Sequence, residues 1–202
     1  MLEQELRETL ARGREQPGVE FKDSRARTDR EFAAKVVRAC LGMANRRDGG
    51  HVIIGVKDDG KGRVQPVGLS SQDAATWNES DLSDTLAEYA DPSVSIESEQ
   101  FTIDGMLLVT VRVSEFYEIP ILCKKDYKGI LRKGACYIRT RKKPETIEVS
   151  SQEDMRELID LATEKSLRTF VSRAVSAGLL PAAQEGPSDE EEFRSQLGDL
   201  SR

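Results

Sequence analysis

The sequence has little of what several common kinds of site require. Its 202 residues include three cysteines and one histidine, and no two cysteines form a CxxC pair. A four-ligand zinc site of the usual spacing is therefore unsupported. The single histidine, His51, excludes most Ser–His or Cys–His catalysis, and we expect a structural role for it. We expect Cys40, Cys123 and Cys136 to be reduced and mostly buried thiols.

Long apolar runs are also lacking. No stretch approaches the roughly 18 apolar residues that a membrane helix needs, and the opening segment MLEQELRETLARGREQ has neither the apolar core nor the cleavage site of a signal peptide. Gly60-Lys61-Gly62 does not fit the GxxxxGK[ST] pattern of a phosphate-binding loop, so no ATPase site is predicted. We therefore expect a cytoplasmic protein that makes no membrane contact.

The order of the predicted elements favours an α+β fold, with a mixed β-sheet flanked by helices. The predicted helices span 2–13, 28–44 (with Thr28 as N-cap and Glu31 completing a capping box), 77–90, 153–165 and a further stretch to 177. The predicted strands lie near 17–24, 51–56, 94–101, 106–113, 121–123 and 135–140. Continuous apolar residues in 51–56 predict burial on both faces, and Asp104-Gly105 predicts a hairpin.

These elements predict four segments along the chain. Residues 1–13 form an N-terminal helix with an apolar stripe of Leu2, Leu6 and Leu10. The main domain covers 14–165, a C-terminal helix covers 166–180, and the remainder, 181–202, is predicted to be an acidic disordered tail.

One group of charged residues has the composition of a metal site. Glu20 and Lys22 alternate with Val19 and Phe21 on a predicted strand, so their side chains should share a face while the apolar pair enters the core. A turn after Glu15 would bring its carboxylate beside Glu20. Asp58 follows the buried strand, at an end where ligands often bind. Hard carboxylates of this kind hold Mg²⁺ or Mn²⁺, although each residue could equally be a solvated surface charge or part of a turn.

The ordered set of motifs resembles the Schlafen core domain, which is described as AlbA-like in bacterial proteins. The motifs occur in this chain in the family's order, as Glu15, Glu20-Phe21-Lys22, Ala44-Asn45, Gly49-Gly50, Ile54-Gly55-Val56, Asp58-Asp59-Gly60 and Gly134-Ala-Cys-Tyr137-Ile-Arg139. The resemblance covers about residues 10 to 165. The cysteine–histidine zinc site of animal Schlafens has no match here.

The resemblance implies a nucleic-acid-binding protein and a function for the charged group. By analogy with nuclease-active Schlafens, Glu15, Glu20 and Asp58 would be metal ligands and Lys22 would join them as a catalytic residue. The implied activity is a metal-dependent endoribonuclease that cleaves structured RNA such as tRNA, in a defence response. Because animal Schlafens duplicate this lobe and the present chain has one, the resemblance also implies a homodimer.

The net charge of −6 taken alone argues against binding to nucleic acid, but the distribution of charge reverses this argument. Residues 181–202 hold six acidic and two basic residues, whereas Lys124 to Lys143 holds nine basic residues and one acidic residue. The basic residues of this window are Lys124, Lys125, Lys128, Arg132, Lys133, Arg139, Arg141, Lys142 and Lys143.

Part of this window has the alternation expected of a binding strand. Tyr137, Arg139 and Arg141 should share one face and offer a ring and two guanidinium groups for stacking and phosphate contacts. Arg46 and Arg47 could add phosphate contacts or merely complement a helix dipole. The alternative is a solvated hairpin.

Two other functions remain open from the sequence. A non-catalytic regulator could bind RNA or DNA through the same basic surface. An interaction subunit of a larger defence complex could dock through the N-terminal helix or the acidic tail.

Overall fold

The computed structural model describes residues 2–58, 63–140 and 144–181, apart from the side chain of Asp58. Its helices are α1 (Glu3–Ala11), α2 (Arg30–Ala44), α3 (Ser71–Ala75), α4 (Glu79–Ala87) and α5 (Gln152–Ser176). Its strands are β1 (Val19–Lys22), β2 (Gly50–Ile54), β3 (Val56–Asp58), β4 (Val64–Pro66), β5 (Ala90–Asp91), β6 (Ile96–Ile103), β7 (Met106–Val113), β8 (Leu122–Cys123), β9 (Tyr137–Arg139) and β10 (Thr146–Glu148). The predicted α+β class is confirmed.

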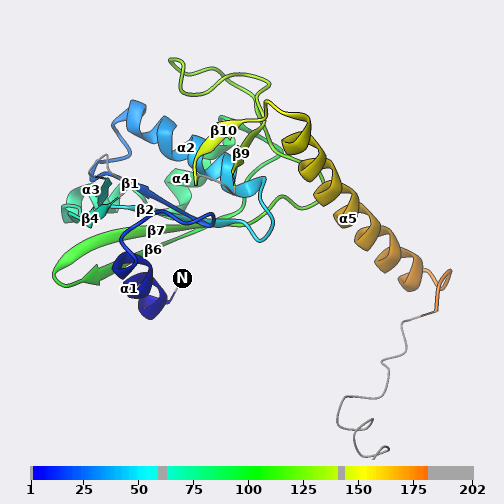
Figure 1. Cartoon of the computed structure of the whole chain (residues 1–202), viewed down its shortest axis with the longest axis horizontal. Coiled ribbons are helices and arrows are strands. Elements are labelled where there is room, and N and C mark those ends of the chain that lie inside the picture. Colours follow the sequence, from blue (N-terminus) through cyan, green and yellow to red (C-terminus); the bar gives the residue numbers. More distant parts are fainter. Residues whose placement is uncertain (1, 59–62, 141–143, 182–202) are drawn as a thin grey trace, which may run out of the picture. The chain divides into compact units, whose positions relative to one another are not determined.

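A four-stranded mixed sheet lies at the centre of the domain, in the order β1-β2-β7-β6 (Figure 1). β1 pairs with β2 in parallel, and β2–β7 and β7–β6 are antiparallel pairs. The predicted hairpin is confirmed, because Asp104 and Gly105 both take positive φ between β6 and β7. β1 is an edge strand of this sheet, which leaves its outer side open to other segments.

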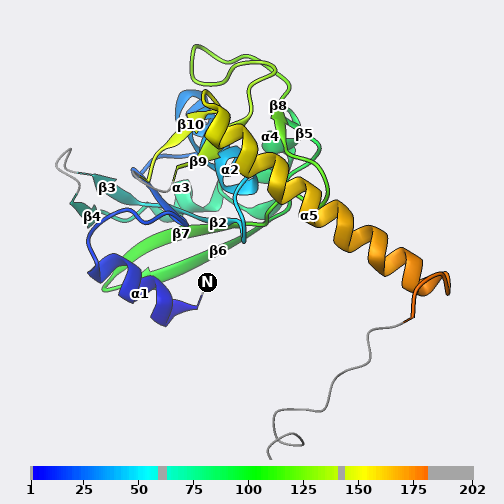
Figure 2. The same ribbon diagram turned by 45° about the vertical axis from the view of Figure 1, so that its right-hand side comes forward.

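Helices cover both faces of the sheet, with α2 on one side and α1 on the other (Figures 1 and 2). Val52 and Ile54 of β2 belong to the core cluster under α2, whereas Ile53 between them belongs to the smaller cluster that contains Leu6 of α1. The continuous apolar run of this strand is thus explained by burial on both faces. Leu6 is fully buried, so the centre of the N-terminal leucine stripe packs within the domain, while Leu2 is exposed.

Helix α2 is the most buried helix of the domain. From Phe32 to Ala44 every residue is buried except Lys35 and Arg38. The sheet lies against one side of the helix, and the β9–β10 hairpin packs against it as well. The predicted N-cap at Thr28 is wrong: the Asp29 carboxylate caps the helix by accepting a hydrogen bond from the Phe32 amide at 3.1 Å.

Two glycines allow the chain to enter and leave the central sheet. At Gly49, with φ +63°, a Cβ would lie 2.0 Å from the carbonyl oxygen of Val113, so no larger residue fits there without displacement of β7. At Gly55, with φ +100°, the chain leaves β2 and continues into β3, which pairs with β4 outside the central sheet. Asp58 therefore ends β3 and does not lie directly at the end of the buried strand β2.

Other predicted elements differ in their bounds. The helix predicted over 77–90 is two helices, α3 and α4, because Asn78 caps α4 after the buried Trp77. The final helical stretches form one helix, α5. The chain divides into two units, residues 1–163 and 164–202, and every site described below lies in the first. Within the described ranges, no helix combines the length and the apolar character needed to cross a membrane.

The buried side chain of Asn45 joins the end of α2 to the segments that follow the sheet. Its amide nitrogen donates to the carbonyl oxygens of Ile121 at 2.8 Å and Tyr137 at 2.9 Å, and its oxygen accepts from the Ile121 amide at 2.7 Å. The single amide group thus satisfies three buried backbone groups.

We expect Asn45→Ala to lower the free energy of unfolding by about 2–4 kcal/mol, because three buried backbone groups lose their partner. The matched control is Asn78→Ala, which removes only an exposed helix cap and should cost about 1 kcal/mol. Urea unfolding followed by fluorescence of the buried Trp77 measures both losses. Equal losses in the two variants would contradict the structural role of Asn45.

Candidate functional site

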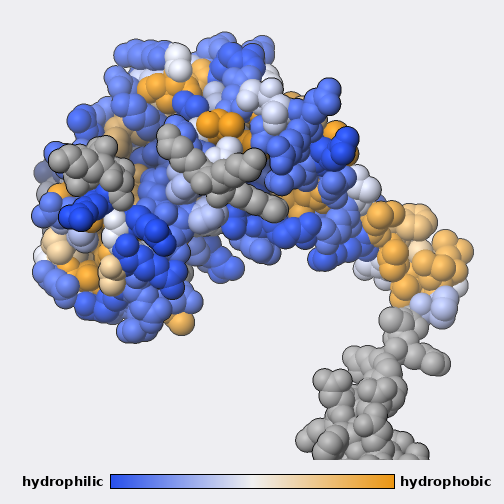
Figure 3. Space-filling model, in the orientation of Figure 1, coloured by the Kyte–Doolittle hydropathy of each residue, from blue (hydrophilic) through white to orange (hydrophobic). Residues whose placement is uncertain are grey.

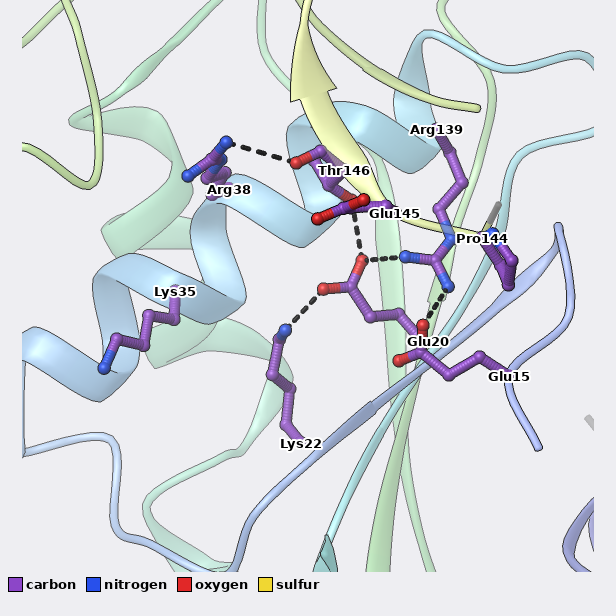
Figure 4. Close-up of a pocket in the computed structure, with 9 residues that line it drawn as sticks. All are labelled: Glu15, Glu20, Lys22, Lys35, Arg38, Arg139, Pro144, Glu145 and Thr146. Carbon is purple, nitrogen blue, oxygen red and sulfur yellow. Dashed lines mark hydrogen bonds and ion pairs between the residues drawn. The ribbon is translucent and has the colours of Figure 1, made fainter. Parts of the chain in front are cut away.

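A small pocket lies between β1, α2 and β10, with a volume of about 240 Å³ (Figure 4). Its wall contains three carboxylates and four cationic side chains. The lining residues are Glu15, Glu20, Lys22, Lys35, Arg38, Arg139, Pro144, Glu145 and Thr146. We call it the carboxylate pocket.

Strand alternation on β1 places Glu20 in this pocket. Val19 and Phe21 pack into the cluster on the α1 side of the sheet, so Glu20 points to the opposite face. There it lies beside Val52, its partner in the parallel ladder, and only 6% of the residue is exposed. A carboxylate so deeply buried needs charged or hydrogen-bonding partners.

The β9–β10 hairpin supplies two of these partners. Arg139 and Thr146 are direct neighbours across the antiparallel ladder, and both bind the same oxygen of Glu20. Arg139 Nη1 donates to Glu20 Oε2 at 2.8 Å, and the Thr146 hydroxyl donates to it at 2.7 Å. Lys22 forms an ion pair with the other oxygen, Oε1. Figure 4 shows the carboxylate enclosed by these three groups.

Glu15 approaches the same guanidinium group from the turn before β1. Arg139 Nη2 donates to Glu15 Oε2 at 2.9 Å and also to the carbonyl oxygen of Val19 at 2.8 Å. The second oxygen of Glu15 accepts from the Phe21 amide at 3.2 Å. The structure therefore brings Glu15 and Glu20 together, with Arg139 bound to both.

The electrostatics of Glu20 reflect two opposing effects. Burial by itself would raise the pKa of Glu20, but the charges of Lys22 and Arg139 and the hydrogen bonds from Lys22 and Thr146 outweigh it, so the pKa is lowered. Glu20 is therefore a stable anion at neutral pH.

The described residues, arranged in this way, do not fit a divalent metal ion. Both oxygens of Glu20 and both oxygens of Glu15 already accept hydrogen bonds, and Lys22 and Arg139 balance the two negative charges. Among the described residues, no three His, Cys, Asp or Glu side chains are grouped so as to hold a metal ion. The third predicted ligand, the carboxylate of Asp58, lies outside the described part.

The predicted binding face of β9 requires a correction. Tyr137 and Arg139 do share a face, but that face points inward: 2% of Tyr137 and 5% of Arg139 is exposed. The Tyr137 ring is covered by Arg38, and its hydroxyl accepts from the Arg132 amide at 2.8 Å. Neither side chain is available to stack on a base or contact a phosphate. Arg141, Lys142 and Lys143 lie outside the described residues.

The first half of the basic window is exposed as expected. Residues 124–133, which we call the basic loop, leave the cationic side chains at the surface, namely Lys124, Lys125, Lys128, Arg132 and Lys133. Lys125 pairs with Glu88, and Arg132 pairs with Glu148. Arg46 and Arg47 line a different pocket, beside Asn45 and the start of α5.

Helix α2 and strand β10 contribute residues to the carboxylate pocket that were not predicted from the sequence. Lys35 and Arg38 lie three residues apart and so share one face of a helix. They alone interrupt the apolar run from Phe32 to Ala44, which is the signal that could have identified them. Thr146 gave no such signal, because its role depends on its position opposite Arg139.

The mixed sheet, the buried helix α2 and the carboxylate pocket define an α+β domain built around one charged, solvent-accessible site. The family model described as Schlafen, AlbA_2 matches residues 15–148, and the chain belongs to this family. Membership indicates a nucleic-acid-binding protein. A comparison with curated proteins finds no match.

Two solved structures are similar to the chain. The DIP2311 protein from Corynebacterium diphtheriae is 18% identical, with a TM-score of 0.48; the match covers 74% of this chain and 26% of that one. The N-terminal domain of a RecG-related protein from Nitrosomonas europaea is 25% identical, with a TM-score of 0.45 over 64% of this chain and 86% of that one. The chain thus spans about a quarter of the first of these proteins.

The lowered pKa of Glu20 predicts an acid-sensitive contribution to stability. A group whose pKa is lower in the folded state stabilises the fold above its unfolded pKa, and this stabilisation is lost as pH falls through the folded pKa. We expect the free energy of unfolding to decrease as pH drops below about 4.5, the ordinary value for this carboxyl group. In Glu20→Gln the free energy of unfolding should change less steeply with pH, by up to about 1.4 kcal/mol per pH unit.

The control for this measurement is Glu97→Gln, because Glu97 makes only an exposed pair with Arg112. Urea unfolding between pH 3 and 7 should show that the free energy of unfolding of this control depends on pH as it does in the wild type. An unchanged pH dependence in Glu20→Gln would show that the carboxylate is not stabilised as the structure implies.

Proposed function

We propose that this protein binds structured RNA through phosphate contacts made by the basic loop. The observation that carries the proposal is the exposure of five cationic side chains within residues 124–133, in a member of a nucleic-acid-binding family. Phosphate contacts supply much of the affinity for nucleic acid and are made mainly by exposed lysine and arginine. The preference for RNA, with tRNA as the first ligand to test, follows the resemblance to nuclease-active Schlafens.

The charge of the basic loop supports this choice over the carboxylate pocket. Within the described part of the chain, Lys124, Lys128 and Lys133 form no ion pair within 4 Å of a carboxylate, and Asp126 is the one acidic residue of the loop. The cations of the carboxylate pocket, by contrast, are largely committed to Glu15 and Glu20. Free exposed charge attracts a polyanion more strongly than charge that is already paired.

The basic-loop variant Lys124→Gln/Lys128→Gln/Lys133→Gln tests the proposal. We expect weaker RNA binding at low salt and a plot of log K against log salt that is shallower by about 2, since each lost phosphate contact removes about 0.7–0.9 from the slope. Fluorescence anisotropy with labelled tRNA, over a series of salt concentrations, measures both quantities.

A matched control removes three positive charges elsewhere, in Arg7→Gln/Arg12→Gln/Arg112→Gln, which lie on α1, at its C-cap and on β7. This variant should bind RNA with nearly the wild-type affinity, and its slope of log K against log salt should lie within about 0.5 of the wild-type slope. Only the long-range attraction between the protein and the RNA is reduced, and salt screens it. Equal effects in the two triple variants would place the RNA on another surface, and undetectable binding by the wild type would remove the proposal.

RNA cleavage at the carboxylate pocket is the second candidate function. It is favoured by one observation, the convergence of Glu15 and Glu20 on a single point, which Arg139 now occupies. As the domain stands, the described residues do not fit a metal ion, so cleavage would first require Arg139 to withdraw. Glu15 and Glu20, with Asp58 as the resemblance implies, would then hold Mg²⁺ or Mn²⁺, which would supply Lewis-acid chemistry at a phosphodiester. Lys22, now paired with Glu20, would then be free to contact a phosphate oxygen. The defence role, the homodimer and a protein partner stay predictions.

The cleavage candidate predicts that wild-type protein degrades tRNA with Mn²⁺ and not with EDTA. Glu20→Gln should lower the rate at least about 100-fold, because one ligand carboxylate is removed. Gel analysis of labelled tRNA measures the products, and the melting temperature of each variant verifies folding. Intact tRNA after incubation of the wild type with Mn²⁺ would eliminate cleavage and leave the binding function.

A further inference from the structure

A second pocket lies against the basic loop and shares no lining residue with the carboxylate pocket. Its volume is about 490 Å³, and its walls come from the start of α2, the end of α4 and the loop itself. The lining residues are Arg27, Arg30, Ala33, Ala34, Thr85, Glu88, Tyr89, Lys125 and Tyr127. We call it the tyrosine pocket. The yellow-green loop that borders it projects at the top of Figures 1 and 2.

Two aromatic rings form one wall of this pocket. Tyr89 and Tyr127 meet edge to face, with ring centroids 6.5 Å apart and planes at 86°. Backbone hydrogen bonds hold both residues. The carbonyl oxygen of Tyr89 accepts from the Lys124 amide at 2.7 Å, and the Tyr127 amide donates to the carbonyl oxygen of Leu131 at 2.9 Å. Tyr89 is buried and Tyr127 is half-buried. The backbone that carries both rings is therefore held in place by the fold.

Cationic groups lie over these rings and at the rim. Lys125 Nζ is 5.2 Å from the centroid of Tyr89, and Lys128 Nζ is 5.7 Å from that of Tyr127. Arg30, the first residue of α2, is exposed at the opposite edge. Flexible lysines over an aromatic face can move aside for a stacked base and then contact its phosphate.

The remaining walls suit a flat polar ring. Ala33 and Ala34 present only methyl groups, which leaves room beside the tyrosines. Glu88 pairs with Lys125 through one carboxylate oxygen, and its other oxygen can accept a hydrogen bond from an exocyclic amino group of a base. Arg27 is occupied in the fold, because it donates to Thr76, Thr85 and Asp81. The face of the domain seen in Figure 3 is mainly hydrophilic, with scattered apolar patches.

We infer that the tyrosine pocket binds one unpaired nucleobase of the RNA, stacked on Tyr127, with the adjoining phosphates on Arg30 and Lys128. The inference rests on the proposed RNA-binding function and adds a specificity to it. Phosphate contacts alone do not distinguish paired from unpaired strands, whereas an aromatic pocket accepts only a base that has left its helix. The protein should therefore prefer RNA with loops, bulges or single-stranded ends.

The decisive experiment compares an adenosine oligonucleotide with an abasic strand of the same length and charge. Wild-type protein should bind the adenosine strand about tenfold more tightly, and Tyr127→Leu should remove this difference without weakening binding to the abasic strand. Tyr127→Phe is the matched control, because it keeps the ring and should keep the preference. The melting temperature of each variant verifies folding.

A second measurement does not depend on any variant. A 2-aminopurine placed in the adenosine strand should lose fluorescence on binding wild-type protein, because stacking on an aromatic ring quenches it, and unchanged fluorescence would overturn the inference. Adenosine monophosphate should compete at least about 100-fold more weakly than the strand, since it lacks the adjoining phosphate contacts. Equal affinity would assign the pocket to a free nucleotide instead.

The outcomes separate this inference from the proposed function. If the basic-loop triple variant weakens binding to both strands while wild type binds both equally, RNA binding stands and the base pocket is wrong. If Tyr127→Leu weakens both strands alike, the tyrosine has only a structural role and the inference also fails. If wild type binds neither strand nor tRNA, the proposed function itself fails.

Discussion

The domain depends on the neutralisation of one buried carboxylate. Glu20 lies on the inner face of an edge strand, where burial opposes its charge, and Arg139 and Thr146 bind it from the β9–β10 hairpin. A buried charge left without its partner costs several kcal/mol, so the hairpin and the sheet are held in one arrangement. Because the hairpin also packs on α2, the same ion pair positions Lys35 and Arg38 beside the carboxylates. The site and the core are therefore built by the same contacts.

The charged residues fall into two groups, those paired with the buried carboxylates and those exposed to solvent. Lys22 and Arg139 are bound to carboxylates, and their charge is largely used within the domain. The lysines of the basic loop face solvent, where a polyanion can reach them. Binding and cleavage would thus belong to different surfaces: the loop can attract RNA with the domain as it stands, whereas chemistry at the carboxylate pocket requires Arg139 to leave. The tyrosine pocket borders this loop, so the proposed contact with an unpaired base would lie beside the proposed phosphate contacts.

Elements that depend on local interactions were predictable from the sequence, whereas those that depend on distant contacts were not. The β6–β7 hairpin was predicted because Asp104-Gly105 is a local turn signal, and α2 was predicted from its apolar period. The capping residue was misplaced by one position, since Thr28 and Asp29 are both good caps and only the course of the backbone selects Asp29. The segment 77–90 was predicted as one helix beginning at Trp77. The real place of Trp77 lies between two helices, where its indole nitrogen donates to the carbonyl oxygen of Arg25 at 2.8 Å.

The sequence by itself determined the α+β class, the resemblance to the Schlafen family and the residues that carry charge, because periodicity, turn chemistry and ordered motifs are local properties. It also placed Glu15 beside Glu20, since a short turn leaves few alternatives. Only the tertiary structure decided which way Tyr137 and Arg139 face, because a period of two defines two faces without saying which is buried. The pairing of Arg139 with Glu20, 119 positions apart in the chain, was likewise decided by the packing of a hairpin on a helix, which no local pattern encodes.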